Sequence, residues 1–432
     1  MRTPRFFADD LMPRVREQFH HVDHCPILDE PRIFFENGGG SLKLKSAIAA
    51  SAEVEALPDQ EGRQNDGSRY LSSLINQGRE DLHLMFGTRG FGGDDDPAVR
   101  GQVISGETGT RLLYRIIRSI ALSAEPGPVL SCNLEHPASL DAAKQWAANT
   151  DREWIEVRFD PDTGTARPEH YAAAVTPDTR LATVIHTSML TGFVVDLPGI
   201  AEAIRSVAPN CFIVVDGIQH APHGGMHVDD YGVDAYVFSP YKAYSRLSLG
   251  FAWINDRVTR VPHEHNLGQS PDLWELGSRD PAFYAAQSKV LDYFCWLGGH
   301  FSSSDDQAEL LAEGSAAMES HEAALIQLLM FGDADSKGLS EYNTITLVGP
   351  AQLEGREGIV SFNLAGVSAS DLVQKFAARG IRVHARISDA YSGHILEALD
   401  IDDCLRVSMC HYNSPREVRD FLSALADIIK EA

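Results

Sequence analysis

An acid and an amine near the ends of two apolar runs are the residues most able to do chemistry. Asp216 follows the run CFIVV, Lys242 lies just past the run VDAYVF in the turn SPYK, and a third run, GFAWI, comes next. The runs are short, apolar or β-branched, and bounded by Gly, Pro, Asp or His, which predicts three buried strands. Because ligands bind at the carboxyl ends of strands in an open α/β sheet, we expect Asp216 and Lys242 to meet at one edge.

A lysine and an acid at one edge are the groups that pyridoxal phosphate (PLP) requires. The Lys242 amine would form a Schiff base with the cofactor, and Asp216 would keep the pyridine nitrogen protonated so that the ring accepts electrons. Taken alone, each residue is better explained as a surface lysine or as a strand-end acid that caps a helix. The surrounding sequence decides between these interpretations.

The order of motifs resembles the PLP-dependent class V aminotransferase family, which includes the cysteine desulfurases and selenocysteine lyases. DGIQ, PH, VD and SPYK precede a strand that begins with glycine, in the order typical of the family. The resemblance covers most of the chain, and it implies an α/β fold-type-I PLP-dependent transferase. Such a protein has a large domain with a mostly parallel seven-stranded sheet and a small C-terminal α+β domain.

The resemblance also assigns roles around the lysine. It implies that Lys242 is the Schiff-base lysine, Asp216 the partner of the pyridinium, Gln219 a donor to the ring hydroxyl and Ser239 a phosphate ligand. The family usually has His before the lysine, but this chain has Tyr241, so a phosphate contact there must come from a phenol.

Met189 is a second departure from the family. It stands where an Asn usually touches the ring hydroxyl, and a thioether cannot make that hydrogen bond. Gln219, or a hydroxyl of Thr187 or Ser188, would then have to make it.

A glycine-containing turn before a helix is the predicted phosphate site. VISGETGT leads into a helix with apolar residues at helical spacing, and free backbone N–H groups at its start would point at an anion. Plain N-capping by Thr108 or Ser105 is the alternative, and one hydroxyl can serve both purposes. By resemblance to the Gly-Thr-Thr-like turn of the family, we assign Thr108 and the backbone N–H of Glu107 to the phosphate.

Two further residues are expected beside the cofactor and the substrate. Glu135-His136 follows a predicted strand and matches a Glu-His pair of the family, which implies that His136 stacks on the cofactor ring and takes part in proton transfer. A loop or cap residue is the alternative for a His before Pro. Asn37, in RIFFENGGGS, matches a family segment that borders the substrate pocket. The GxGxxG pattern is missing there, so no nucleotide fingerprint is predicted.

The segment LGSRDP implies a subunit interface. Gly277 and Ser278 align with a Gly-Thr that, in the family, reaches the phosphate of the partner subunit's cofactor, and Arg279 adds a positive charge nearby. The resemblance therefore implies a homodimer with shared active sites. Capping of the following helix explains Ser278 alone equally well.

The C-terminal part predicts a small α+β layer. EGIVSFNL, IRVHA and CLRVSM read as strands, and SASDLVQKFAARG and PREVRDFLSALADII as helices. LRVSMCHYN resembles the terminal strand of the family, in which an arginine binds the substrate carboxylate, so Arg406 is the predicted carboxylate anchor. A guanidinium fork suits that role better than a lysine. A surface salt bridge is the alternative.

The segment before that last strand lacks a feature of many cysteine desulfurases. They carry a nucleophilic cysteine there that accepts a persulfide, but this chain has no cysteine between Arg382 and Asp403. Cys404 opens the strand and Cys410 lies past Arg406, so neither is placed like that nucleophile. The predicted loop instead carries polar groups suited to a different substrate side chain, or merely solvated: His384, Arg386, Asp389, Tyr391 and His394.

These features predict an enzyme that binds an amino acid to PLP as an external aldimine, with Lys242 as general acid and base once it is released. Desulfurase-like lyase chemistry without the persulfide cysteine and transamination both remain open. A catalytically inactive binding protein is the alternative of another class, and the presence of Lys242, Asp216, His136 and Arg406 together argues against it. The sequence does not identify the amino acid.

Length and composition set the remaining expectations. The chain has 432 residues, 44% of them hydrophobic, which is enough for one large and one small domain. We expect an N-terminal arm over residues 1–30, a large PLP-binding domain over 31–297 and a small domain over 298–432. No second ligand pair with zinc-site spacing follows the histidines of the arm, so no metal is predicted.

The charge and the cysteines bear on partners and compartment. A net charge of −24 repels phosphate backbones and argues against nucleic acid as a partner. No run approaches the roughly 18 apolar residues of a membrane span, and the charged N-terminus predicts no secretory signal. The six cysteines are scattered without a CxxC pair, which favours a reducing cytoplasm.

Overall fold

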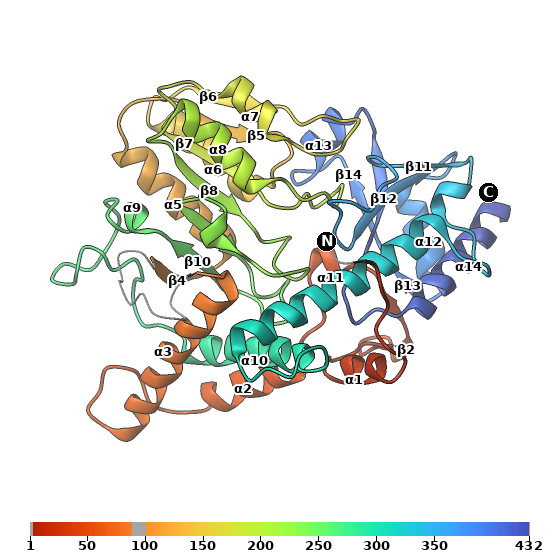
Figure 1. Cartoon of the computed structure of the whole chain (residues 1–432), viewed down its shortest axis with the longest axis horizontal. Coiled ribbons are helices and arrows are strands. Elements are labelled where there is room, and N and C mark those ends of the chain that lie inside the picture. The colour runs from red at the N-terminus through yellow and green to blue at the C-terminus, as the bar shows by residue number, and fades with distance from the viewer. Residues whose placement is uncertain (1–2, 89–100, 432) are drawn as a thin grey trace.

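A computed structural model describes residues 3–88 and 101–431. A large sheet with its helices lies on one side and a smaller sheet with its helices on the other (Figure 1). The large sheet has seven strands in the order β4-β10-β9-β8-β7-β5-β6. Their bounds are β4 Gln102–Gly106, β5 Val129–Cys132, β6 Trp154–Val157, β7 Leu181–Ile185, β8 Phe212–Asp216, β9 Ala235–Phe238 and β10 Gly250–Ile254.

Most of this sheet is parallel, as predicted. Strands β5 to β9 pair in parallel, whereas β10 pairs antiparallel with both β4 and β9. The three strands predicted around Asp216 and Lys242 are β8, β9 and β10. This arrangement confirms the predicted fold class.

Helices cover both faces of the large sheet. Val214 and Val237 pack in one apolar cluster with residues of α5 and α6, while Val215 and Phe238 belong to a cluster that includes residues of α3, α8 and α10. Burial on both faces explains why these strands are continuous apolar runs. The helices of this part are α2 Lys45–Glu55, α3 Asp66–Phe86, α5 Gly109–Ser123, α6 Pro137–Asn149, α7 Pro168–Ala174, α8 Leu197–Val207, α9 Asp256–Thr259 and α10 Pro281–Gly298.

The small sheet is antiparallel, in the order β11-β12-β15-β14. Its strands are β11 Ile345–Leu347, β12 Ile359–Leu364, β14 His384–Ile387 and β15 Asp403–Ser408, and the neighbouring helices are α11 Gln307–Phe331, α12 Ala369–Ala377, α13 Gly393–Ala398 and α14 Pro415–Glu431. Ser368 caps α12 by accepting a hydrogen bond from the backbone N–H of Asp371. The predicted loop before β15 is wrong in detail, because His384 and Arg386 lie on β14 and His394 lies on α13.

The N-terminal segment contacts both parts. It contains α1 Leu11–Glu17, β1 His24–Cys25, β2 Glu30–Pro31 and β3 Ile33–Phe34, and β3 pairs in parallel with β13 Ile381–Arg382. Val15 is buried in the core of the large sheet, and Phe35 in that of the small sheet. Short 3-10 helices occur as η1 Asn37–Gly39, η2 Val228–Asp230 and η3 Leu339–Glu341. The domain boundaries drawn from the sequence stay predictions.

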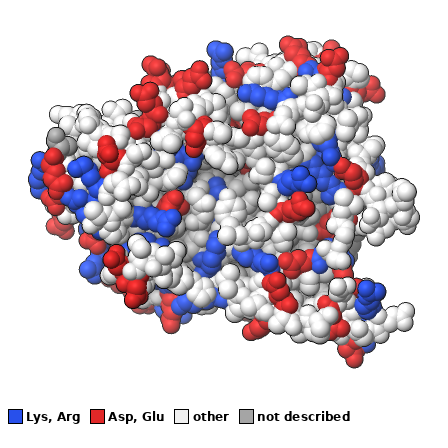
Figure 2. Space-filling model, turned by 180° about the vertical axis from the view of Figure 1, so that it is seen from behind, with Lys and Arg blue, Asp and Glu red and all other residues white. Residues whose placement is uncertain are grey.

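Seen from behind, the surface is hollowed near its middle, and Lys and Arg side chains lie around the hollow (Figure 2). Many Asp and Glu side chains lie toward the outline of this face, in keeping with the acidic composition. Within the described ranges, none of the helices has the length and apolar character needed to cross a membrane.

Candidate active site

Lys242 and Asp216 are buried close enough for the charge of each to affect the pKa of the other, as their positions after β9 and β8 predicted, and the buried region around them is called the pocket below. The Lys242 side-chain amine donates a 2.8 Å hydrogen bond to Oε1 of Gln219. Asp216 ends β8, and its Oδ1 accepts a 3.0 Å hydrogen bond from the backbone N–H of Ile218. Lys242 is 8% exposed and Asp216 3%. Both groups are therefore held away from bulk water.

Burial shifts the pKa of both groups toward neutrality. Burial, together with the nearby positive charges of Arg406 and Arg386, lowers the pKa of Lys242 to about 7 against the opposing effect of Asp216. Burial raises the pKa of Asp216 to about 6, although the hydrogen bond from Ile218 and the charge of Lys242 oppose the shift. Lys242 can thus supply an uncharged, nucleophilic amine near neutral pH.

Arg406 enters the same pocket from β15. It is 2% exposed, and its Nη1 donates a 3.0 Å hydrogen bond to the carbonyl oxygen of Met189. A Cβ atom on Gly38 would stand 2.9 Å from the guanidinium carbon, so the glycine-rich turn makes room for this side chain. Burial lowers the pKa of Arg406 to about 9. The guanidinium is available to an anionic ligand.

The predicted phosphate end is formed by the start of α5 and the loop after β9. Thr108 is the N-cap of α5, and its Oγ1 accepts a 3.0 Å hydrogen bond from the backbone N–H of Arg111. A Cβ atom on Gly109 would lie only 2.4 Å from Oγ of Ser239, so the two segments approach closely at a glycine. The Glu107 side chain instead forms a 3.1 Å ion pair with Arg111. Its carboxylate is thereby partly neutralised.

His136 is the N-cap of α6, on the loop after β5. Its Nδ1 accepts a 3.0 Å hydrogen bond from the backbone N–H of Ala138, which leaves the proton of a neutral ring on Nε2. Burial, with the positive charges of Lys242 and Arg386, lowers its pKa to about 3. The ring is therefore uncharged near neutral pH, which suits stacking on a cofactor ring.

Two buried polar atoms without partners are available to a ring hydroxyl. Nε2 of Gln219 and Oγ1 of Thr187 are buried and unpaired among the described residues. Ser188 is engaged, because its Oγ accepts hydrogen bonds from the backbone N–H groups of Leu190 and Thr191. Of the two hydroxyls proposed as substitutes for the missing asparagine, that of Thr187 is thus the unpaired one.

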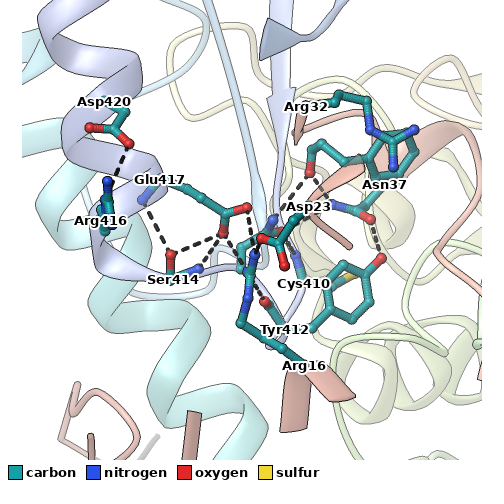
Figure 3. Close-up of polar contacts among 12 residues, drawn as sticks. Arg16, Asp23, Arg32, Asn37, Cys410, Tyr412, Ser414, Arg416, Glu417 and Asp420 are labelled. Atoms are coloured by element: carbon teal, nitrogen blue, oxygen red, sulfur yellow. Dashed lines mark hydrogen bonds and ion pairs between the residues drawn. The ribbon is translucent and has the colours of Figure 1, made fainter. Parts of the chain in front are cut away.

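Asn37 has a saturated amide group. Its Nδ2 donates to the carbonyl oxygen of Ser408 at 2.8 Å and to Oδ1 of Asn413 at 3.2 Å. Its Oδ1 accepts a hydrogen bond from the Tyr412 hydroxyl (Figure 3). These contacts join the N-terminal segment to the chain after β15. The predicted contact of Asn37 with substrate stays a prediction.

Tyr241 and Ser278 lie farther out. Tyr241 packs against the glycine-rich turn, since a Cβ atom on Gly40 would stand 3.2 Å from its ring, and burial raises the pKa of its phenol. Ser278 is exposed and lines a surface groove with Glu107 and Arg111. The phosphate contacts predicted for Tyr241 and Ser278 stay predictions.

Arg386 is the site residue that sequence reasoning undervalued. It is 8% exposed, and its Nη2 lies 3.5 Å from Sδ of Met189. The alternation HARI, with Arg386 two residues after His384, was a signal that the strand continues beyond Ala385. The polar residues that follow favour a loop and outweigh this alternation.

The cysteines near the small sheet are buried. Cys404 and Cys410 each have 0% exposure. Burial raises the pKa of Cys404 to about 12 and that of Cys410 well above its usual value. Cys410 also belongs to a buried group with His223 and Glu322 whose ligand atoms lie within 4.8 Å of one another, and this group contains no histidine of the N-terminal segment.

The residues present fit PLP. The buried amine with a pKa near 7 suits the aldehyde of the cofactor, and the buried acid at a strand end suits its pyridine nitrogen. The unpaired donors on Gln219 and Thr187 suit the ring hydroxyl. The helix start close to Ser239 suits the phosphate. Lys242, Asp216, Gln219, Thr108 and Ser239 would hold the cofactor.

Comparisons with known proteins agree with this fit. The chain is 26% identical over 429 residues to the aminotransferase-like protein FGM3 of Gibberella zeae, covering 96% of this chain and 98% of that protein. It is 25% identical over 417 residues to a cysteine desulfurase of Haloferax volcanii, covering 91% and 89%. The structure of a cysteine desulfurase from Thermococcus onnurineus NA1 superposes with a TM-score of 0.80 at 18% identity, covering 100% of this chain and 99% of that one.

The family model for aminotransferase class-V matches residues 102–280 and 300–421, which is more than half of the chain. Members of this family use PLP. This chain therefore belongs to the class V aminotransferase family and is a PLP-dependent enzyme, a lyase or a transferase.

Proposed function

We propose that this enzyme is a lyase that cleaves a bond at Cβ of an amino-acid substrate and releases the product without storing it on a cysteine. The observation that carries the proposal is the pocket in which the Lys242 amine, with a pKa of about 7, lies beside Asp216 and within the electrostatic field of Arg406. Such a pocket holds an amine nucleophile, a partner for the pyridine nitrogen and a carboxylate anchor together.

Each residue has a distinct task in this proposal. Arg406 binds the substrate α-carboxylate and fixes the orientation of the Cα–H bond. Lys242 takes the proton from Cα and returns one, and Asp216 keeps the pyridine nitrogen protonated. The bound cofactor supplies an electron sink for the charge that develops at Cα.

The buried thiols support release without a persulfide. A thiolate is the attacking form of cysteine, and a raised pKa makes it scarce at neutral pH. Cys404 and Cys410 are both fully buried with raised pKa values. Neither is suited to accept sulfur from a substrate.

Incubation of the PLP-loaded enzyme with a panel of L-amino acids tests the proposed reaction class. A lyase should convert its substrate without an added keto acid and keep its cofactor in the original form. Consumption that requires a keto acid, with amino transfer to it, would establish transamination instead.

Alkylation and mass spectrometry after incubation with cysteine test the cysteine-free release. We expect any sulfur to leave as free sulfide, and the double variant Cys404→Ser/Cys410→Ser to keep most of its turnover. The variant Cys25→Ser/Cys295→Ser, which changes thiols away from the pocket, is the matched control. A persulfide on Cys404 or Cys410, with activity lost on its replacement, would restore the desulfurase mechanism.

We also infer a homodimer whose sites are shared, with Ser278 near the phosphate bound by the partner subunit. The exposure of Ser278, and of the adjoining groove beside the start of α5, supports this inference. The six cysteines carry free thiols, which is consistent with the prediction of a reducing cytoplasm.

A further inference from the structure

Arg386 and Arg406 are two buried cations that face the same pocket. In the register of the antiparallel pair β14 and β15, Arg386 lies opposite Cys404, and Arg406 is two residues further along β15. Side chains alternate between the faces of a sheet, so the two arginines are diagonal neighbours on one face. Both reach Met189, Arg406 through its carbonyl oxygen at 3.0 Å and Arg386 through its sulfur at 3.5 Å.

Neither guanidinium is neutralised by the protein. Within residues 3–88 and 101–431, no carboxylate forms an ion pair with Arg386 or Arg406, and the Nε atom of each is buried without a hydrogen-bond partner. The nearest acids are engaged elsewhere. Glu36 pairs with Arg382 and His384, and Asp389 accepts from backbone N–H groups of its own loop.

Two unpaired buried cations side by side are costly for the protein. Burial disfavours a charge that lacks a partner, and the positive charge of Arg386 adds to the effect of burial in lowering the pKa of Arg406. A bound anion removes this cost. A single carboxylate bound to Arg406 leaves the positive charge of Arg386 without a counter-charge. A second anionic group in the pocket would neutralise it.

We infer that the substrate is an α-amino acid with an anionic side chain, a carboxylate or a sulfinate. Arg406 binds the α-carboxylate, and Arg386 binds the anionic group of the side chain. The inference rests on the proposed function, because it requires that an amino acid occupies the pocket with its carboxylate on Arg406. Arg386 is thus the residue that selects acidic over neutral substrates.

Absorbance titration of the PLP-loaded enzyme measures this selectivity as a ratio of dissociation constants. The pairs are aspartate with asparagine, glutamate with glutamine, and cysteine sulfinate with alanine. We expect the acidic member of at least one pair to bind at least about tenfold more tightly, since a hydrogen-bonded charge pair has this magnitude. The aspartate, glutamate and sulfinate arms show which anion and which chain length fit best.

Variants assign the selectivity to Arg386. Arg386→Gln should bring the ratio close to one while alanine binding changes little, and Arg386→Lys should keep part of the ratio. Arg379→Gln, which removes an arginine that pairs with Glu431 on the surface, should keep all of it. Ratios near one in the wild type, or an unchanged ratio in Arg386→Gln, would overturn the inference.

Thermal unfolding without PLP gives a second measurement that needs no catalysis. Succinate carries two carboxylates and should raise Tm more than propionate at equal concentration, and Arg386→Gln should abolish the difference. If Arg386→Gln fails to fold, the ratios of dissociation constants measured with the wild-type enzyme test the inference by themselves. Loss of any spectral response to every amino acid would refute the proposed function itself, whereas binding without acidic preference would refute only this inference.

Discussion

The Lys242 amine is activated by its surroundings rather than by a single base. Burial and the charges of Arg406 and Arg386 lower its pKa, while Asp216 works in the opposite direction and keeps the shift moderate. A lysine with a pKa close to the working pH combines a nucleophilic amine with the ability to hold a proton. Burial, with the charges of Lys242 and Arg386, lowers the pKa of His136 and keeps its ring neutral.

The rate at which PLP attaches to the cofactor-free protein should follow the ionisation of Lys242. The protonated amine cannot attack an aldehyde, so the rate should rise with pH through about 7 and then level. Arg386→Gln removes a repelling charge and should move the rise to higher pH. Stopped-flow absorbance between pH 5.5 and 9.5 measures both profiles. A rate that still climbs steeply at the top of this range would indicate an ordinary lysine.

Replacement of Asp216 should separate folding from catalysis. Asp216→Ala should keep the fold and covalent PLP attachment but lower turnover on the order of 100-fold, because the electron sink weakens. Asp196→Asn, which exchanges one good helix cap for another at an exposed position, is the control. Steady-state kinetics with unaltered circular dichroism provide the measurement. Full activity of Asp216→Ala would make this acid purely structural.

At the scale of elements, the ends of strands and the starts of helices position the side chains of the candidate active site. Strands β8 and β9 bring Asp216 and Lys242 to one edge, α5 begins with Thr108 beside the Ser239 loop, and β15 carries Arg406 in from the smaller sheet. Close approaches at Gly38 and Gly109 let these elements meet. The pocket thus depends on contacts between segments that are distant in sequence.

Thr108 should serve both as a helix cap and as a phosphate ligand. Thr108→Ala should cost about 1 kcal/mol of unfolding free energy and weaken PLP binding about tenfold. Ser368→Ala removes an equivalent cap on α12 and should cost similar stability without any change in PLP affinity. Denaturant unfolding and equilibrium titration with PLP report the two effects. Equal PLP affinity in both variants would show that Thr108 caps the helix and does not bind the phosphate.

The sequence indicates the elements of the large sheet because their residues are buried on both faces and form continuous apolar runs, as in β8. It does not indicate the burial of Arg386, which depends on β15 and on Met189, each brought near by the fold. Asn37 shows the same limit, since its amide is occupied by Ser408, Tyr412 and Asn413 some 370 residues later in the chain. Motif order predicts which residues hold the cofactor, while partners across elements appear only in the folded chain.

At the scale of the whole molecule, the N-terminal segment and α11 tie the two sheets together. Phe7 stacks on His321 of α11 with ring centroids 4.2 Å apart, and Arg16 pairs with Glu417 of α14 (Figure 3). Residues of α11 belong to the cores of both parts. The relative position of Arg406 and Lys242 is therefore supported by extensive packing.

The inferred dimer should be visible in solution and in PLP binding. Light scattering should give a mass about twice 47.3 kDa. Ser278→Asp should weaken PLP binding by placing a negative charge near the phosphate of the partner's site, whereas Ser206→Asp at another exposed position should not. A single-chain mass at micromolar concentration, with unchanged PLP affinity in Ser278→Asp, would contradict shared sites.

The central claim is that Lys242 binds PLP covalently, and borohydride reduction of the purified protein tests it most directly. We expect a yellow protein whose visible absorption band disappears on reduction, with mass spectrometry locating the reduced cofactor on the peptide that contains Lys242. Lys242→Ala should lose the covalent attachment and still be able to retain PLP noncovalently. Lys43→Ala, which removes a half-buried lysine, should keep the covalent attachment. A wild-type protein that stays colourless after PLP is added, or a label on any other lysine, would contradict the account.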